Sequence, residues 1–206
     1  MSTLPTTSRP PSCAPDSAPS GASRSEPSGA SSARLTLERI VDEAIALLDE
    51  EGPDSLSMRR LAARLGTSTM STYHHVPDRG SLIEAIADRL MSALEMPDKD
   101  AGWADTIRQL SWSFREITRR HPSPFKLLLS DQRPVALLRV GERVNERLVV
   151  LGFEEREAIL AFRSFVRYLL GSAMTEADSP LPADELDATF HHGLELMIAG
   201  IAATRT

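Results

Sequence analysis

From Arg34 onward, apolar residues recur at spacings of three and four, which is the period of an α-helix with one buried face. The first such stretch, LTLERIVDEAIALLDEEG at 35–52, begins beside a residue suited to cap it, Thr36, and stops at a residue suited to end it, Gly52. Its apolar face carries Ile40, Val41, Ala44, Ile45, Leu47 and Leu48. The pattern predicts an amphipathic helix that packs against other helices.

Three shorter helices are predicted next. The helix over 57–65 has a serine at its start and is closed by Gly66, and the helix over 68–75 is short because Pro77 follows at once. A longer one begins at Asp78 or Arg79 and ends near Leu94.

Five further helices are predicted over 103–120, 122–129, 134–151, 154–175 and 182–203. The one β-like run, 148–151, lies within helical sequence and is followed by Gly152. The expected fold is therefore all-α. A three-helix helix-turn-helix domain at 34–96 is joined by a helix to a larger helical domain at 97–206.

The first 33 residues have a different composition. Residues 1–33 contain ten Ser and six Pro, but no aromatic residue and no Val or Ile, which predicts a disordered leader. The leader lacks the apolar core of a signal peptide, and no apolar run approaches the roughly 20 residues that span a bilayer. Cys13 is the only cysteine, so an internal disulfide is excluded, and a reducing, cytoplasmic location is expected.

Residues 57–75 have the organisation of a helix-turn-helix, with a capped helix, a glycine turn and a short polar helix. In that motif the second helix enters the major groove of DNA and reads bases with its N-terminal residues. Small polar side chains at Ser68, Thr69 and Ser71 suit this role, because they let the backbone approach the bases closely. A purely structural helix hairpin would more often carry Leu or Ala there.

Residues 34–95 resemble the DNA-binding domain of TetR-family transcriptional repressors. The pattern of that family is a first helix ending in EG, then LxxRxLAxxLG, then LYxHFxxKxxLL. This chain reads EG at 51–52, LSMRRLAARLG at 56–66 and YHHVPDRGSLI at 73–83. It departs from the family pattern at Thr67, Thr72, Arg79 and Gly80.

The resemblance implies a role in DNA binding for nine residues. Tyr73 and Arg79 are expected to contact phosphates, and Arg59 a guanine edge or a phosphate. The positions that read bases in the family are occupied here by Ser68, Thr69, Met70, Ser71 and His74, and His75 is expected near the DNA backbone.

Neither pair of adjacent histidines, 74–75 or 191–192, predicts a metal site. Neighbouring residues on a helix point about 100° apart, so such a pair does not chelate one ion, and no third ligand lies at a suitable spacing. A catalytic nucleophile would need a base beside an activated Ser or Cys. The sequence therefore predicts no metal, no cofactor and no enzymatic activity.

The charge distribution bears on DNA binding. The chain carries a formal net charge of −6, whereas DNA-binding surfaces are usually basic. Residues 55–80 nevertheless contain four Arg and one Asp, while the acids cluster on the first helix. Positive charge is thus expected on the motif, with Arg60 and Arg64 solvated rather than bound to DNA.

Residues 97–206 resemble, more loosely, the C-terminal domain of regulators of the tetracycline-repressor type, through the stretches 119–122 and 190–200. The resemblance implies a ligand-binding and dimerisation domain. Apolar faces for a homodimer are expected on the last two helices, at Ile159, Phe162, Phe165, Val166, Leu169, Leu170, Phe190, Leu194, Met197, Ile198 and Ile201. Glycines at 171, 193 and 200 are expected to permit close helix approach.

A pocket for a small-molecule effector is expected inside the same domain. The candidate lining residues are Ile107, Leu110, Phe114, Ile117, Phe125, Leu128 and Phe162, and the alternative for each is an ordinary filled core. Leu110 and Leu128 stand where tetracycline-binding relatives place polar or histidine side chains. A mostly hydrophobic or aromatic effector is therefore expected, and a magnesium–tetracycline complex is not implied.

Two classes of function follow. The first is a ligand-responsive transcriptional repressor that binds a palindromic DNA operator as a homodimer. The second is an all-α small-molecule-binding or catalytic protein whose helix hairpin does not touch DNA. The arginine-bearing, small-residue second helix of the motif favours the first.

Overall fold

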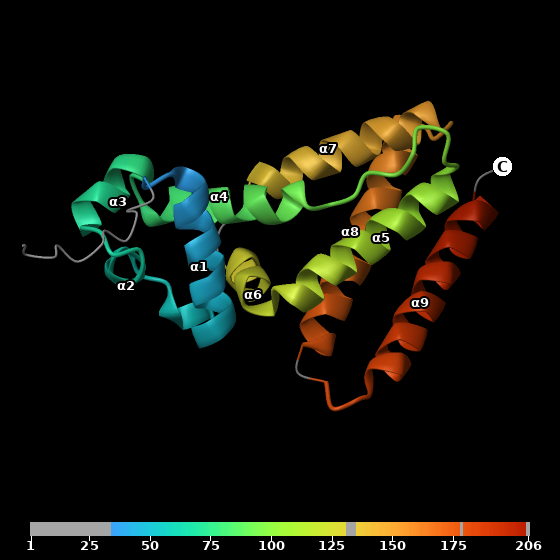
Figure 1. Cartoon of the computed structure of the whole chain (residues 1–206). Helices are drawn as coiled ribbons and strands as arrows, with labels where there is room; N and C mark the ends of the chain where they lie inside the picture. Colours follow the sequence, from blue (N-terminus) through green and yellow to red (C-terminus); the bar gives the residue numbers. More distant parts are fainter. Residues whose placement is uncertain (1–33, 131–134, 178, 205–206) are drawn as a thin grey trace, which may run out of the picture. The chain divides into compact units, whose positions relative to one another are not determined.

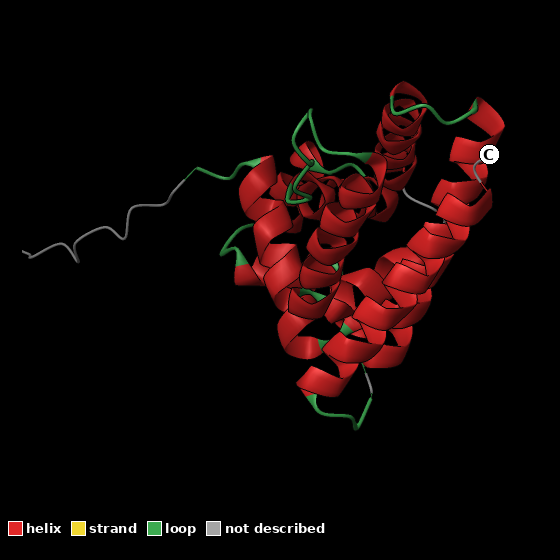
Figure 2. Ribbon diagram, turned by 90° about the vertical axis from the view of Figure 1, so that its right-hand side faces the viewer, coloured by secondary structure: helices red, strands yellow, loops and turns green. Residues whose placement is uncertain are grey.

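A computed structural model describes residues 34–130, 135–177 and 179–204, and within these ranges the chain is helical with no strand (Figures 1 and 2). The elements are α1 (Leu37–Glu51), η1 (Pro53–Ser55), α2 (Met58–Arg64), α3 (Thr69–His75), α4 (Arg79–Ser92), α5 (Trp103–Arg120), α6 (Pro122–Ser130), α7 (Val135–Val150), α8 (Glu155–Glu176) and α9 (Ala183–Thr204). The all-α prediction is confirmed. The predicted disordered leader lies outside the described residues.

Side-chain caps fix where the first four helices begin. The hydroxyls of Thr36, Ser57 and Ser68 and the carboxylate of Asp78 each accept a backbone N–H from the third residue of the helix that follows. The expected end of α1 is also confirmed, since Gly52 adopts a φ of 87° and its N–H donates to Leu48 O at 2.8 Å.

The short turn η1 was not predicted from the sequence. Its Ser55 is buried, and the hydroxyl donates to the carbonyls of Gly52 at 2.7 Å and Leu47 at 3.3 Å. These bonds satisfy a polar side chain in the core, and they position the chain between α1 and α2.

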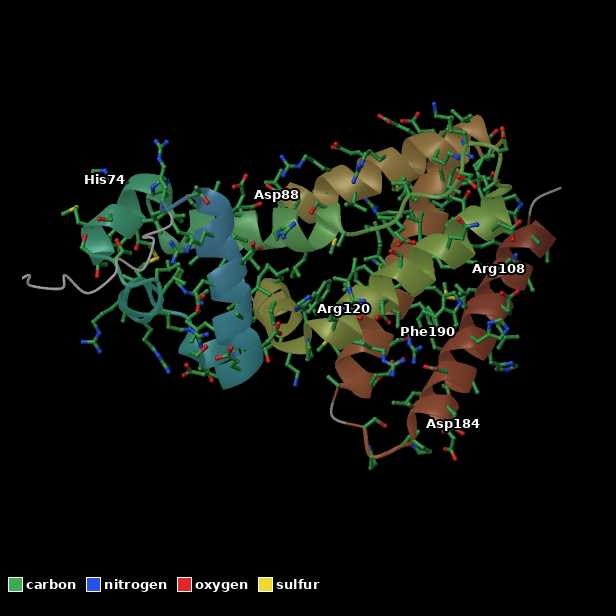
Figure 3. All side chains as sticks on the ribbon, in the orientation of Figure 1. His74, Asp88, Arg108, Arg120, Asp184 and Phe190 are labelled. Atoms are coloured by element: carbon green, nitrogen blue, oxygen red, sulfur yellow. The ribbon has the colours of Figure 1, made fainter. Side chains whose placement is uncertain are left out.

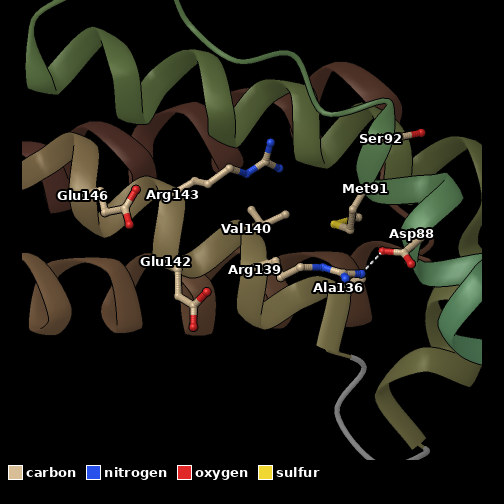
Figure 4. Close-up of a pocket in the computed structure, with 9 residues that line it drawn as sticks. All are labelled: Asp88, Met91, Ser92, Ala136, Arg139, Val140, Glu142, Arg143 and Glu146. Carbon is tan, nitrogen blue, oxygen red and sulfur yellow. Dashed lines mark hydrogen bonds and ion pairs between the residues drawn. The ribbon is translucent and has the colours of Figure 1, made fainter.

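Helix α4 connects the helix-turn-helix to the rest of the chain, and α7 lies beside it (Figure 1). The Glu84 carboxylate accepts the N–H of Val135 at the start of α7, with both oxygens 3.0 Å away, and one turn further along Asp88 pairs with Arg139. Between the two helices is an open groove of about 460 Å³, which the Asp88–Arg139 pair bridges (Figure 4). The two contacts therefore hold α7 against α4.

A second link joins α1 to the bend between α5 and α6. His121 Nδ1 lies 2.7 Å from Asp49 Oδ2, and α1 packs on α6. One hydrophobic cluster runs from α1 through to α9. The chain from Leu35 onward forms one compact unit. The expected boundary between a DNA-binding domain and an effector-binding domain at residues 96 and 97 is therefore a division of function, and it remains a prediction.

Arginines on one side of α5 hold the last helix in place. Arg108, which is labelled in Figure 3, binds Glu195 of α9 at 2.6 Å, and Arg115 binds both Glu176 of α8 and Asp187 of α9. Arg108 holds the pKa of Glu195 below its usual value, and Arg115 does the same for the pKa of Asp187. Charge pairs with α5 therefore add to the buried apolar contacts of Phe190, Leu194 and Ile198 in attaching α9 to its own chain.

The apolar faces predicted for a homodimer are only partly available to a partner. Phe165, Phe190, Leu194 and Ile198 are buried within one chain, so the expectation that they face a second copy is wrong. Large apolar side chains that are exposed on α8 and α9 are instead Leu160, Met174 and Leu196.

The glycines divide in the same way. Gly193 permits close approach within the chain, since a Cβ there would lie 2.7 Å from the Tyr168 hydroxyl. Gly171 and Gly200 have open space around them.

Candidate nucleic-acid interface

Two buried residues orient the predicted reading helix, α3. Thr72 and Val76 are almost fully buried on its inner side, and the Thr72 hydroxyl bonds back to Ser68 O at 3.3 Å. Thr72 replaces the aliphatic residue of the family pattern without leaving a buried polar atom unpaired. Because side chains three and four residues apart share a helix face, burial of the Thr72 side turns the opposite face outward.

The outward face of α3 carries Met70, Tyr73 and His74, at spacings of three and four. Met70 is 68% exposed and Tyr73 43%, and His74 is also exposed. Figure 3 shows His74 on the side of α3 that faces away from α1. His75 is exposed as well, whereas Thr69 is half-buried. The structure thus brings the predicted base-reading residues onto one helix but exposes them unequally.

The two serines of α3 are engaged with each other. The Ser71 N–H donates to Ser68 Oγ at 3.0 Å, and the two hydroxyl oxygens share a hydrogen bond at 2.8 Å. Ser68 is the N-cap of the helix, so its hydroxyl has a structural task that the sequence reading left out.

Two exposed arginines lie on the neighbouring helices, Arg59 on α2 and Arg79 at the first position of α4. Arg79 follows Asp78, whose pKa lies below its usual value because its carboxylate accepts the backbone N–H of Ser81. These positions match the predicted roles as phosphate contacts, which remain a prediction.

Arg60 and Arg64 are exposed, as expected, but both are also engaged in ion pairs that were not expected. Arg60 pairs with Glu51, and Arg64 pairs with Glu43 at 2.5 Å and Glu50 at 2.6 Å, all three on α1. Hydrogen bonding to Arg64 lowers the pKa of Glu50, and the bonds to both glutamates raise the pKa of Arg64. The acids of α1 therefore pair with two of the four arginines counted on the motif.

The described residues contain no cluster of His, Cys, Asp or Glu arranged to hold a metal ion. Over the same ranges, none of the helices combines the length and the apolar character that crossing a bilayer requires.

The seven candidate effector residues all belong to the hydrophobic cluster or pack against it. Ile107, Leu110, Ile117, Phe125 and Leu128 are buried in it, and Phe114 and Phe162 are partly buried beside it. The rings of Phe114 and Phe125 meet edge to face at 5.1 Å. Phe162 packs on the backbone of α7, since a Cβ at Gly141 would lie 2.8 Å from its ring. None of the seven lines the groove between α4 and α7.

Sequence reasoning missed two sets of residues. One comprises Glu84, Asp88 and Arg139, which link α4 to α7 across about fifty residues of sequence, a distance at which no spacing rule signals a contact. The other is centred on Arg115, whose guanidinium lies over the rings of Phe190 at 4.6 Å and Trp112 at 5.2 Å. A charged residue on the inner edge of an amphipathic helix was the only available signal.

Comparisons with known proteins match both the helix-turn-helix and the helical region that follows it. Residues 40–86 match the family described as bacterial regulatory proteins, tetR family, and residues 96–186 match the tetracyclin repressor-like C-terminal domain. The HTH-type transcriptional repressor DrrR1 of Streptomyces coeruleorubidus is 33% identical over 147 residues, which cover 69% of this chain but only 54% of that protein.

Two solved structures share the fold. A substituted TetR from Acinetobacter baumannii AYE, in complex with minocycline, aligns with a TM-score of 0.72 and 26% identity over 84% of this chain and 99% of that one. BioQ with its double-stranded DNA operator aligns with a TM-score of 0.66 and 25% identity over 82% and 99%. With both domain models matched in order along it, the chain belongs to the tetR family of bacterial regulatory proteins.

Proposed function

We propose that the chain is a ligand-responsive transcriptional repressor that binds a palindromic DNA operator as a homodimer in the cytoplasm, and that it acts by binding rather than by catalysis. The observation that carries this is the outward face of α3, where Met70, Tyr73 and His74 are exposed, with exposed arginines at Arg59 on α2 and Arg79 on α4, the helices before and after it. Base-reading side chains flanked by phosphate-binding arginines are what entry into a major groove requires. The DNA operator in the BioQ complex supports the same use of the fold.

Dimerisation follows from the size of α3. A helix of seven residues buries too little DNA for tight specific binding, so two copies related by a two-fold axis are needed. The exposed side chains of Leu160, Met174 and Leu196 on α8 and α9 supply apolar surface for a partner. Light scattering at micromolar protein should give twice the 22.5 kDa chain mass, and a monomer would contradict this part of the proposal.

Base-reading and phosphate-binding residues are expected to differ in the kind of loss they cause. His74→Ala and Thr69→Ala should change sequence preference, each by roughly 1–3 kcal/mol at the base contacted. Arg79→Ala and Tyr73→Phe should weaken binding to all sequences about equally, because phosphates carry no sequence information. Fluorescence anisotropy on operator and scrambled duplexes separates the two patterns, and an unchanged preference in the first pair would remove those residues from the reading set.

The salt dependence of DNA binding distinguishes the repressor from the second alternative, a helical protein that does not bind DNA. Phosphate contacts release counterions, so affinity for mixed DNA fragments should fall steeply as salt rises from about 50 to 200 mM, and Arg79→Ala should reduce that slope. Salt-insensitive binding, or none, would favour a protein that binds only small molecules.

The effector is proposed to be a small, mostly hydrophobic or aromatic molecule bound among the apolar residues of α5, α6 and α8. The TetR structure that contains minocycline shows that a relative of the same fold accepts a small molecule. The route to the DNA-binding helices is supplied by two links, Glu84 and Asp88 of α4 to α7, and Asp49 of α1 to His121. A ligand that shifts α6 or α7 would alter both.

Such a ligand releases DNA only if it binds the released conformation more tightly than the DNA-competent one. Compounds that raise the melting temperature of the protein are therefore expected to weaken operator binding in proportion to their affinity. The measurement is a thermal-shift screen followed by anisotropy with operator DNA. Tight binders that never change DNA affinity would argue against this coupling.

A further inference from the structure

The α3 side chains that are not hydrogen-bonded within the protein indicate which base the operator must present. Ser68 and Ser71 are hydrogen-bonded to each other, and Ser68 also caps the helix. The Thr72 hydroxyl is turned inward to Ser68 O. These three side chains are largely occupied in holding α3 together.

Met70 is the most exposed large apolar side chain on α3, and it shares the outward face with Tyr73 and His74. A thioether is at best a weak hydrogen-bond acceptor, so Met70 recognises an apolar group if it recognises anything on a base edge. The major groove offers one apolar group, the C5-methyl of thymine.

We infer that Met70 packs on a thymine methyl, so that each half-site of the operator contains a thymine whose methyl group is required for full affinity. The inference rests on the proposed function and deepens it by naming the base. His74, four residues along on the same face, lies beside Met70 and supplies a hydrogen-bonding group for an adjacent base pair. Specificity is thereby placed on the Met70–His74 pair rather than on the serines.

The contact is tested with uracil, which differs from thymine only in lacking the methyl group. The full chain first selects its operator from a random DNA pool. Each thymine of a half-site is then replaced in turn by deoxyuridine, and affinities are measured by anisotropy for the unaltered protein, Met70→Ala and Met70→Leu. Met96→Ala is the matched control, because Met96 is also an exposed methionine but lies between α4 and α5.

For the unaltered protein, uracil at one position per half-site should weaken binding roughly fourfold, and roughly fifteenfold when both half-sites carry it. Met70→Ala should bind thymine and uracil operators equally, while Met70→Leu and Met96→Ala keep the thymine preference. All three substitutions are at exposed side chains, and an unchanged melting temperature verifies folding.

Two failures are distinguishable. If the chain enriches no sequence from the pool, the proposed function fails and this inference falls with it. Suppose instead that a sequence is enriched but replacing any of its thymines by deoxyuridine leaves the affinity unchanged, or that Met70→Ala loses as much affinity from the replacement as the unaltered protein does. In either case only the Met70 contact is overturned.

Discussion

Arg115→Ala is expected to lower the free energy of unfolding by about 3–5 kcal/mol, a larger loss than any single surface substitution should cause. The Arg115 side chain is 3% exposed, and its Nε and Nη1 donate to Glu176 at 3.0 Å and Asp187 at 2.7 Å. Removing the guanidinium leaves the Glu176 carboxylate, 12% exposed, without its countercharge. The substitution also removes the cation that lies over the Phe190 and Trp112 rings.

A matched control is available one turn further along α5. Arg119 pairs with the same Asp187 at 2.9 Å, but its side chain is 41% exposed and screened by water. Arg119→Ala should therefore change stability little. Urea unfolding followed by circular dichroism, at one protein concentration, measures both variants. Equal losses from the two substitutions would show that burial of Arg115 is not what makes its pairs matter.

Gly193→Ala is expected to destabilise the chain by about 1–3 kcal/mol, in spite of the better helix propensity of alanine. A Cβ at this position would lie 2.7 Å from the Tyr168 hydroxyl and 2.8 Å from its ring. The same hydroxyl donates to Phe190 O at 2.6 Å, so relief of the overlap pulls Tyr168 away from α9 and strains this bond. Because the ring of Tyr168 also stacks on Phe190, the packing of α8 on α9 suffers with it.

Gly200→Ala on the same helix is the control. Gly200 has open space around it, so alanine there should stabilise the chain by up to about 1 kcal/mol through helix propensity alone. Thermal unfolding of the two variants, at equal protein concentration, compares them directly. If Gly193→Ala were as stabilising as Gly200→Ala, the close contact between α8 and α9 would be absent in solution.

Helix positions could be predicted from the sequence because local signals set them. The bounds expected for α5 are those observed, and α6 to α9 begin and end within one residue of expectation. The caps at Thr36 and Ser57 and the glycine at 52 are short-range features, readable a few residues at a time.

What the sequence did not yield depends on pairs of residues that are far apart along the chain. The ion pairs of Arg64 could not be predicted because its partners, Glu43 and Glu50, lie on another helix. Phe190 looked like dimer surface because an apolar stripe does not say whether its partner is the same chain or a second copy. The Ser68 cap was missed for a different reason: it is a local contact with Ser71, but the small polar residue at 68 was assigned to base reading instead.

Selection of bound DNA from a random pool tests the central claim most directly. The proposed function predicts a palindromic sequence whose two half-sites are separated by about one helical turn of DNA, as two copies of α3 in successive major grooves require. His74→Ala should alter the same base position in both halves. No enrichment, or enrichment of a single unpaired half-site that His74→Ala leaves unchanged, would contradict the assignment of this chain as a homodimeric repressor that reads DNA through α3.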